Sequence, residues 1–231
     1  MKPRGCTGSG CLFCRAGQAD WSAQVLANRQ TRRYTKGSIL FAEGEPVTGV
    51  FFMYSGLVKI HKQWAPQKQL IVHFAQPGEM IGYRGLGDDP IFPVTATALE
   101  ETIICWFELP FFEVSLTLNH GLTLTLMKVF ANALQEAERR MRNLALMVVK
   151  ARVADMLLML QRTFGTGVNG YINGRQTRQD MAAYAGIPYE TLFRTFQELE
   201  RQGLIQQTGK QLRLLDPDAL RQLTQLTTND Q

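Results

Sequence analysis

Histidine and long apolar runs are scarce in this chain, and each scarcity argues against a class of function. Among 231 residues there are 3 histidines and 4 cysteines. The histidines are scattered and no nucleophile motif accompanies them, so we expect a protein that is not an enzyme. No uncharged apolar stretch approaches the roughly 20 residues that a helix needs to cross a bilayer, so we expect no membrane partner. The N-terminal residues lack the apolar run of a signal peptide, which predicts a cytoplasmic protein.

The charge of the chain is only weakly biased. It has 25 basic and 20 acidic residues, a formal net charge of +5. An excess of this size suits a nucleic-acid binder but also many other proteins, so the distribution of the charges has to decide between them. Hydrophobic residues make up 45% of the chain, which is enough to bury a sizeable core.

Residues 34–108 alternate between short apolar runs and glycines. Val, Ile, Phe and Thr, which are common in strands, fill the runs. Short strands separated by regular glycine turns are typical of an all-β sandwich or barrel. A short amphipathic helix is expected before them, at Trp21–Asn28. The predicted strands are Ser38–Phe41, Val50–Met53, Leu57–His61, Leu70–Phe74, Val94–Ala98 and Thr102–Phe107.

Residues 119–147 have the periodicity of one long helix. Apolar residues recur at alternating spacings of three and four, which is an a/d heptad pattern, and charged residues surround it. A helix packed on its own domain is one interpretation. So regular a pattern is more typical of a helix that pairs with a second copy of itself, so we predict a homodimer. The predicted interface residues are Met127, Phe130, Leu134, Ala137, Met141 and Leu144.

Residues 177–203 predict two helices separated by a tight turn. Thr177 and Asp180 form the Thr-x-x-Asp start of a helix. Gly186 suits the left-handed residue that ends this helix, and Pro188 fits the first turn of the next one. The second helix has a core stripe at i, i+4 and i+7, formed by Leu192, Phe196 and Leu199.

The segments on either side complete a winged-helix pattern. A further helix is predicted at Val149–Thr163, and the Gly- and Asn-rich stretch Phe164–Gly174 predicts a turn-linked hairpin. Two short strands are predicted within Leu204–Leu215, joined by Thr208-Gly209-Lys210. A helix-turn-helix in this setting leaves its second helix able to enter a major groove of DNA.

The outward face of that second helix carries aromatic, amide and charged side chains. Arg194 has the fork geometry that pairs with guanine, and Glu190 can accept a hydrogen bond from cytosine. Cationic and amide side chains near the first helix and in the wing are placed to hold phosphates. The alternative is a helical hairpin with a solvated charged face, but an exposed Phe193 favours a partner surface. The predicted DNA-binding residues are Arg175, Thr177, Arg178, Gln179, Tyr189, Glu190, Phe193, Arg194, Gln197 and Lys210.

These motifs resemble the Crp/Fnr superfamily, which includes the cyclic AMP receptor protein and the fumarate–nitrate reduction regulator. Glu190-Thr191 with Arg194 matches the Glu-Thr-x-x-Arg core of the family's recognition helix, and Pro77–Gly82 matches its β-roll. The resemblance implies an α+β protein with an N-terminal β-roll, like the cyclic-nucleotide-binding jelly roll, a long dimerisation helix and a C-terminal winged helix-turn-helix. It implies a transcription regulator whose partners are double-stranded DNA, a second copy of the chain and RNA polymerase. The implied boundaries are a Cys-rich segment at 1–20, the β-roll at 21–118, the dimerisation helix at 119–147 and the DNA-binding domain at 148–231.

The segment that holds the cyclic nucleotide phosphate in the cyclic AMP branch departs from the family pattern here. That branch carries an Arg-Ser pair after its Gly-Glu segment. This chain instead has Asp88-Asp89, followed by mostly apolar residues up to Thr95. Two carboxylates repel an anionic phosphate, and Arg84 is the single cation nearby in the sequence. The sequence therefore argues against cyclic AMP as the ligand.

The cysteines indicate a different cofactor. Cys6, Cys11 and Cys14 have the spacing C-x4-C-x2-C, and Cys105 stands alone before the predicted dimerisation helix. Thiolates spaced in this way, with a distant fourth, can hold iron–sulfur clusters. The oxygen-sensing Fnr branch also has three N-terminal cysteines and a fourth at this place, so the resemblance implies a 4Fe-4S or 2Fe-2S cluster. The N-terminal spacing differs from that of the oxygen regulator itself, which leaves the cluster type open.

Three alternatives to a sensing cluster stay open. The N-terminal cysteines suit a zinc site completed by His120 or Cys105. Cys105 also suits a small buried core residue, in which case the regulator is apo or answers to an unknown small effector. Plant-type ferredoxins share the C-x4-C-x2-C spacing, so the third alternative is an iron–sulfur electron carrier. The predicted winged helix argues against a carrier, because electron transfer needs no arginine-bearing recognition helix.

Overall fold

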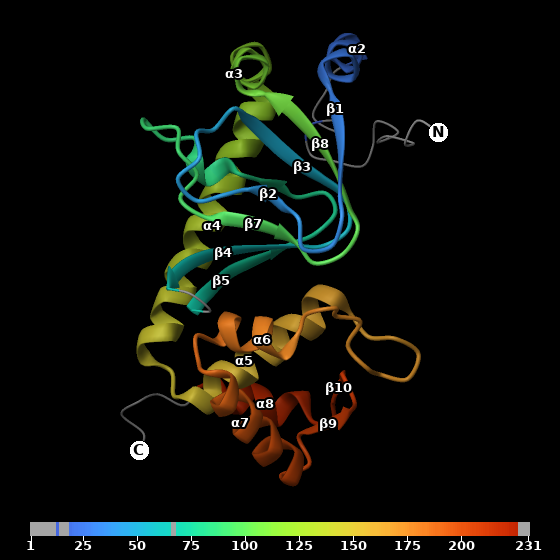
Figure 1. Ribbon diagram of the computed structural model, residues 1–231, viewed down its shortest axis with the longest axis vertical. Helices are drawn as coiled ribbons and strands as arrows, with labels where there is room; N and C mark the ends of the chain where they lie inside the picture. Colours follow the sequence, from blue (N-terminus) through green and yellow to red (C-terminus); the bar gives the residue numbers. More distant parts are fainter. Residues whose placement is uncertain (1–12, 14–18, 66–67, 226–231) are drawn as a thin grey trace. The chain divides into compact units, whose positions relative to one another are not determined.

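The computed structural model describes residues 13, 19–65 and 68–225, and the chain divides into two compact units, Met1–Leu134 and Gln135–Gln231 (Figure 1). The first unit is rich in strands, and the second is mainly helical with a two-stranded sheet. Within the described part of the chain, no helix is both long enough and apolar enough to cross a bilayer.

Two four-stranded antiparallel sheets form the β-roll of the first unit, with strand orders β1-β8-β3-β6 and β2-β7-β4-β5. Each of the six predicted strands coincides with an observed one, and the predicted β-roll is confirmed. Two strands are absent from the prediction, because β1 is mostly polar and β6 has only two residues. The strands are β1 (Gln30–Tyr34), β2 (Ile39–Phe41), β3 (Gly49–Ser55), β4 (Val58–Ala65), β5 (Lys68–Ala75), β6 (Met80–Ile81), β7 (Thr95–Ala98) and β8 (Thr102–Glu108).

Strands β3 and β8 of the first sheet are largely buried on both faces, which explains why their central residues are apolar. Successive side chains of a strand point to opposite faces. Phe51 and Met53 of β3 belong to the core inside the roll, with the aromatic pair Phe41 and Phe92 stacked at a centroid distance of 4.1 Å. Residues of the alternate set pack on the outer face in a second core, the outer cluster, which comprises Phe13, Val25, Val50, Phe52, Met80, Cys105, Phe107, Phe112, Leu122 and Leu126.

Helices cover this outer face. The predicted helix before the strands is confirmed as α2 (Ala19–Asn28), and a 3-10 turn, η1 (Tyr83–Gly85), follows β6. After β8 the chain continues directly into α3 (Leu109–Leu118), which the sequence analysis does not predict. Its apolar residues carry no helical period that separates them from the preceding strand, and Pro110 in its first turn is the one local start signal.

The predicted long helix is confirmed as α4 (His120–Leu146). One of its faces enters the outer cluster through Leu122 and Leu126, which are 1% and 4% exposed. The six predicted interface residues, called the seam below, lie elsewhere on the helix. Met127, Leu134 and Met141 are more than 60% exposed, which is unusual for apolar side chains at this spacing. The helix therefore has an apolar stripe beyond the one that its own domain buries.

The second unit contains the end of α4 and the predicted winged helix-turn-helix, which is confirmed. Its core is built from the buried sides of the helices, including Leu157, Leu160, Phe196 and Leu199. The final helix, α8, is absent from the prediction, although Asp216 caps it and Pro217 starts it. The elements are α5 (Val149–Phe164), α6 (Arg178–Ala185), α7 (Tyr189–Arg201), β9 (Ile205–Thr208), β10 (Gln211–Leu214) and α8 (Pro217–Leu223).

A capping box starts α6, as the sequence predicts. The backbone N–H of Asp180 donates to Thr177 Oγ1 at 3.0 Å, and the backbone N–H of Thr177 donates to the Asp180 carboxylate at 3.0 Å. The Thr177 hydroxyl also donates to the same carboxylate at 2.7 Å. Two backbone donors that have no partner within the helix are thereby satisfied.

Replacing Thr177 by alanine should lower the free energy of unfolding of the second unit by about 1 kcal/mol, because the cap oxygen is lost. Denaturation followed by circular dichroism measures the change. Thr177→Ser keeps the hydroxyl and serves as the matched control. Equal losses in the two variants would mean that the methyl group, and not the cap, stabilises this helix start.

Candidate nucleic-acid interface

The turn between α6 and α7 is set by one glycine. Gly186 has the left-handed backbone angles φ 65° and ψ 40°, a conformation that costs little only without a Cβ. Its N–H and that of Ile187 both donate to the carbonyl of Ala182, which closes the end of α6. Pro188 then occupies the N-cap position in extended conformation, one residue before α7 and not within its first turn as predicted. The turn therefore follows from local sequence, as predicted.

Helix α7 has one buried face and one exposed face. Leu192, Phe196 and Leu199 are at most 1% exposed, as the i, i+4, i+7 stripe predicts. The predicted base-reading residues lie on the other face and are all exposed: Tyr189, Glu190, Phe193, Arg194 and Gln197. Phe193 leaves 51% of its surface exposed between these polar neighbours. This face offers hydrogen-bond donors, acceptors and an aromatic ring together.

The residues predicted to hold phosphates are divided between exposed and internal positions. Arg175, Gln179 and Lys210 are exposed. Arg178 is partly buried, and its guanidinium lies 4.8 Å from the centroid of the Phe196 ring and donates to Gln207 Oε1 at 3.2 Å. Burial lowers the pKa of Arg178, although an arginine stays charged near neutral pH. A phosphate contact by Arg178 therefore has to compete with these internal contacts.

The hairpin of β9 and β10, called the wing below, is joined to α7 by polar contacts. The strands β9 and β10 pair in antiparallel register, with Gly209 at the tip in left-handed conformation. Glu200 near the end of α7 accepts from the backbone N–H of Gln207 at 2.8 Å and from its side-chain amide at 3.1 Å. Because Arg178 binds the same amide through its oxygen, Gln207 links the wing to both helices of the motif. This places Lys210 at the exposed end of a braced hairpin.

The predicted cofactor ligands are only partly described. Cys6, Cys11 and Cys14 lie outside the described residues. Cys105 is fully buried on β8, opposite Phe52 of β3. Within the described part of the chain, no cluster of three or more His, Cys, Asp or Glu side chains is arranged to hold a metal ion.

Phe13 is the described residue closest in sequence to the N-terminal cysteines, and it packs beside Cys105. Its ring centroid lies 4.6 Å from that of Phe107 and 5.3 Å from that of Phe52. Phe52 is the cross-strand partner of Cys105, and Phe107 follows two residues along β8, so both share its sheet face. A residue between Cys11 and Cys14 is thus anchored on the face of the sheet that carries Cys105.

Comparison with known proteins identifies the family to which this chain belongs. Residues 151–223 match the model of the Crp-like helix-turn-helix domain, and residues 31–114 match that of the cyclic nucleotide-binding domain. The transcriptional activator protein FnrA of Stutzerimonas stutzeri is 30% identical over 91% of this chain and 87% of that protein. The chain belongs to the Crp/Fnr family of transcription regulators. Its relatives in this family are regulators and not enzymes.

Other relatives and solved structures agree. The transcriptional activator protein anr of Pseudomonas aeruginosa is 30% identical over 81% of this chain and 78% of that protein. Among solved structures, FixK2 from Bradyrhizobium japonicum is 26% identical with a TM-score of 0.75, covering 84% of this chain and 96% of its own. The global regulator CLP of Xanthomonas campestris shares the fold, with a TM-score of 0.74 and 22% identity. The match covers 85% of this chain and 99% of that chain. As in other members of the Crp/Fnr family, the helix-turn-helix is a DNA-binding module.

Two arginines near the turn are absent from the predicted site. Arg140 of α4 and Arg152 of α5 both donate to backbone carbonyls at the end of α6. The only sequence signal for Arg140 is a charge that flanks the seam, which is also what a solvated helix face contains. Their contacts are set by tertiary packing, so a local pattern gives no means of finding them.

Replacing Arg194 by alanine should cost about 1–3 kcal/mol of binding to a matched DNA site, because a bidentate contact to guanine is lost. The loss should be confined to discrimination at one base pair. Titration against the matched site, against sites altered at single positions and against random DNA measures it.

Arg201→Ala is the matched control, since Arg201 is exposed on the last turn of the same helix and donates to the Gln197 carbonyl at 3.4 Å. Any loss in this variant should be uniform across sequences. Equal losses for Arg194→Ala on matched and random DNA would exclude a base-reading role for Arg194.

Proposed function

We propose that this Crp/Fnr-family regulator binds DNA as a homodimer and that an iron–sulfur cluster makes its DNA binding depend on oxygen or redox state. The proposed ligands are Cys6, Cys11, Cys14 and Cys105. The observation that carries the proposal is the anchoring of Phe13, which stands between two of the N-terminal cysteines, beside Cys105. The relatives from Bacillus subtilis and Pasteurella multocida that are named anaerobic regulatory protein, both 26% identical, are consistent with it.

The residues present fit such a group. Phe13, which precedes Cys14 in the sequence, packs in the outer cluster that also contains Cys105. Cys105 lies among aromatic and aliphatic side chains, which exclude water from whatever its thiolate binds. When bound, a cluster supplies an oxygen-reactive iron centre, while the protein supplies the thiolates and the dry surroundings that tune it.

Cys105 is close to the proposed dimerisation helix α4, both along the chain and in the packing of the outer cluster. Only three residues separate it from Leu109, where α3 begins, and α4 follows one residue after α3. Leu122 and Leu126 of α4 pack in the same outer cluster as Cys105. A change at Cys105 can therefore reach α4 through the packing of the outer cluster. Shifts of packed helices at subunit interfaces are an established means of switching.

The alternative is a regulator of the same fold without metal, either apo or with an unknown small effector. The complete burial of Cys105 favours this interpretation on its own, since buried cysteines often serve as small hydrophobic core residues. The electron-carrier alternative loses its support, because the chain belongs to a family of transcription regulators.

The homodimer rests on the seam. Apolar side chains along one line of α4 remain exposed, and burying them against a second copy removes them from water. In that assembly each α7 enters a major groove, and we propose that Glu190, Phe193 and Arg194 contact base edges there, with Phe193 against a thymine methyl. Relatives named as transcriptional activators support RNA polymerase as the further partner.

Replacing Phe130 by glutamate should split the dimer, because like charges then meet across the two-fold axis in an apolar interface. Phe130 is 38% exposed and its ring lies 5.6 Å from that of Tyr83. Analytical ultracentrifugation measures the association. Asn132→Glu, at an exposed position on another side of α4, is the control and should remain dimeric. A Phe130→Glu protein that sediments as a dimer would move the interface away from the seam.

Replacing Cys105 by serine should abolish cluster binding, because a thiolate ligand is lost. Protein prepared without oxygen and with iron should contain iron and sulfide and absorb visible light, and the variant should lose all three. Val50→Ala, which trims another fully buried residue of the outer cluster, is the control for damage to packing and should keep its iron. A colourless, iron-free wild-type protein would contradict the cluster and leave the metal-free regulator.

A further inference from the structure

The end of α6 is held by a side chain from the dimerisation helix. Arg140 of α4 donates from Nη2 to the carbonyl of Tyr184 at 3.0 Å. The central carbon of the Arg140 guanidinium, Cζ, lies 3.7 Å from the centroid of the Tyr184 ring. The group therefore stacks on the ring while it binds the backbone. Stacking and hydrogen bonding together fix a guanidinium far better than either contact alone.

A second arginine completes the arrangement from α5. Arg152 donates from Nη1 to the carbonyls of Ala185 and Gly186, both at 3.2 Å. Three consecutive carbonyls at the end of α6 thus accept hydrogen bonds from two arginines. The last carbonyls of a helix have no partner within it and carry partial negative charge, which favours cations there.

The local turn does not supply these contacts. The backbone N–H groups of Gly186 and Ile187 both return to Ala182, which leaves the later carbonyls to partners from outside α6. The surroundings are largely dry: Tyr184 is 4% exposed, and burial raises the pKa of its hydroxyl and lowers the pKa of Arg152. Charged hydrogen bonds are stronger in such surroundings than at an open surface.

Arg140 also flanks the seam. Ala137, Met141 and Leu144 lie on the adjoining side of the same stretch of α4, within the second unit. A partner helix packed on the seam would fix this stretch, and Arg140 connects it to the turn that leads into α7. The distance between the two recognition helices would then depend on Arg140.

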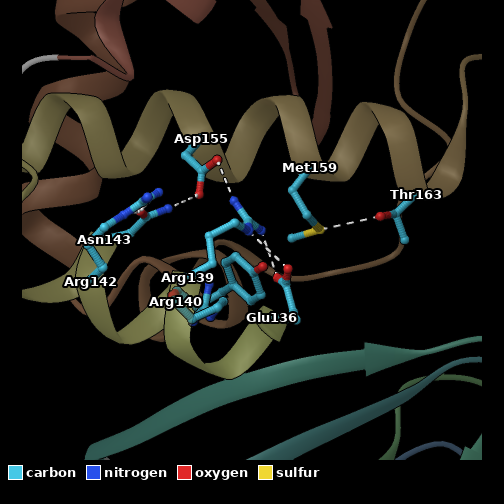
Figure 2. A network of polar contacts seen from close by, with 9 residues as sticks. Glu136, Arg139, Arg140, Arg142, Asn143, Asp155, Met159 and Thr163 are labelled. Atoms are coloured by element: carbon cyan, nitrogen blue, oxygen red, sulfur yellow. Dashed lines mark hydrogen bonds and ion pairs between the residues drawn. The ribbon is translucent and has the colours of Figure 1, made fainter. Parts of the chain in front are cut away.

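A separate group of contacts attaches α5 to α4 without involving the turn. Asp155 of α5 accepts from Asn143 at 3.2 Å and pairs with Arg139 at 3.4 Å, and Arg139 binds Glu136 as well (Figure 2). These contacts remain when Arg140 is replaced. A variant at Arg140 therefore keeps these contacts between the two helices and removes the direct link to the end of α6.

We propose that Arg140 is a positioning residue for DNA recognition, which fixes the end of α6 to the dimerisation helix and so sets the separation of the two recognition helices. The proposal rests on the proposed homodimer. Arg152, which belongs to the DNA-binding domain itself, holds the turn in shape within each protomer. The two arginines thus have different roles, one between half-sites and one within a half-site.

The test measures how DNA affinity depends on half-site spacing. Full-length protein is titrated against one half-site, against two half-sites at the spacing that the wild type prefers, and against two half-sites moved apart by two base pairs. The ratio of the last two affinities reports the spacing preference. A purely structural residue would change all three affinities together.

Arg140→Met should reduce this ratio at least about fivefold, a loss of coupling within the usual range between two sites. Its affinity for one half-site should stay within about twofold of wild type. Arg140→Lys keeps the charge but not the planar fork, so its spacing ratio should lie between those of the wild type and Arg140→Met. Arg142→Met is the matched control, because Arg142 lies on the same helix, is exposed and binds the side chain of its neighbour Asn143. Arg152→Met should instead weaken binding to one half-site.

Each contrary outcome has a distinct meaning. A dimeric wild type with a clear spacing preference and an unchanged ratio in Arg140→Met would overturn the role of Arg140 alone. Equal losses on one half-site and on both paired sites would reduce Arg140 to a structural residue and overturn the proposal in the same way. A wild type that sediments as a monomer would overturn the homodimer and this proposal together.

Discussion

The burial of β3 and β8 on both faces of their sheet positions the face that carries Cys105. Along β3 and β8, alternate side chains point into the roll and out of it, so each strand contributes to two cores at once. The outer core is where Phe13, Cys105 and the first turns of α4 meet. A polar residue at an outward position of β8 would leave α3 and α4 without an apolar surface to pack on. The same apolar demand explains why a cysteine is tolerated there.

The sequence predicts those elements in which a local pattern of apolar or capping residues matches the way that the element packs. The short apolar runs between glycines in the β-roll, the heptad repeat in α4 and the cap and glycine around α6 are each local signals, so the sequence analysis places these elements well. It does not find α3, because an apolar helix that follows an apolar strand shows no change of period. It does not find β1 either, since an edge strand of mostly polar residues owes its conformation to the neighbour with which it pairs.

The residues of the candidate site likewise divide into those set by local sequence and those set by contacts between distant elements. The exposed face of α7 is predictable because the buried stripe fixes the opposite side of a helix. The placement of Arg178 is not, because its contact with Phe196 depends on how α6 crosses α7, and its bond to Gln207 depends on the wing. The contacts of Arg140 and Arg152 likewise join elements that are distant in sequence. Residues that hold a motif in place are therefore harder to predict than residues that the motif presents.

Two exposed surfaces of this chain differ in a way that favours different partners. The seam of α4 exposes methionine and leucine, and such side chains gain by packing against similar side chains of a second copy. The face of α7 exposes an aromatic ring between Glu190 and Arg194, whose charges would be costly to bury against protein without partners. Base edges in a major groove offer those charges hydrogen bonds and the ring a methyl group. The proposed protein partner for the seam and the nucleic-acid partner for α7 are thus supported by the same rule, that a buried group needs a matching neighbour.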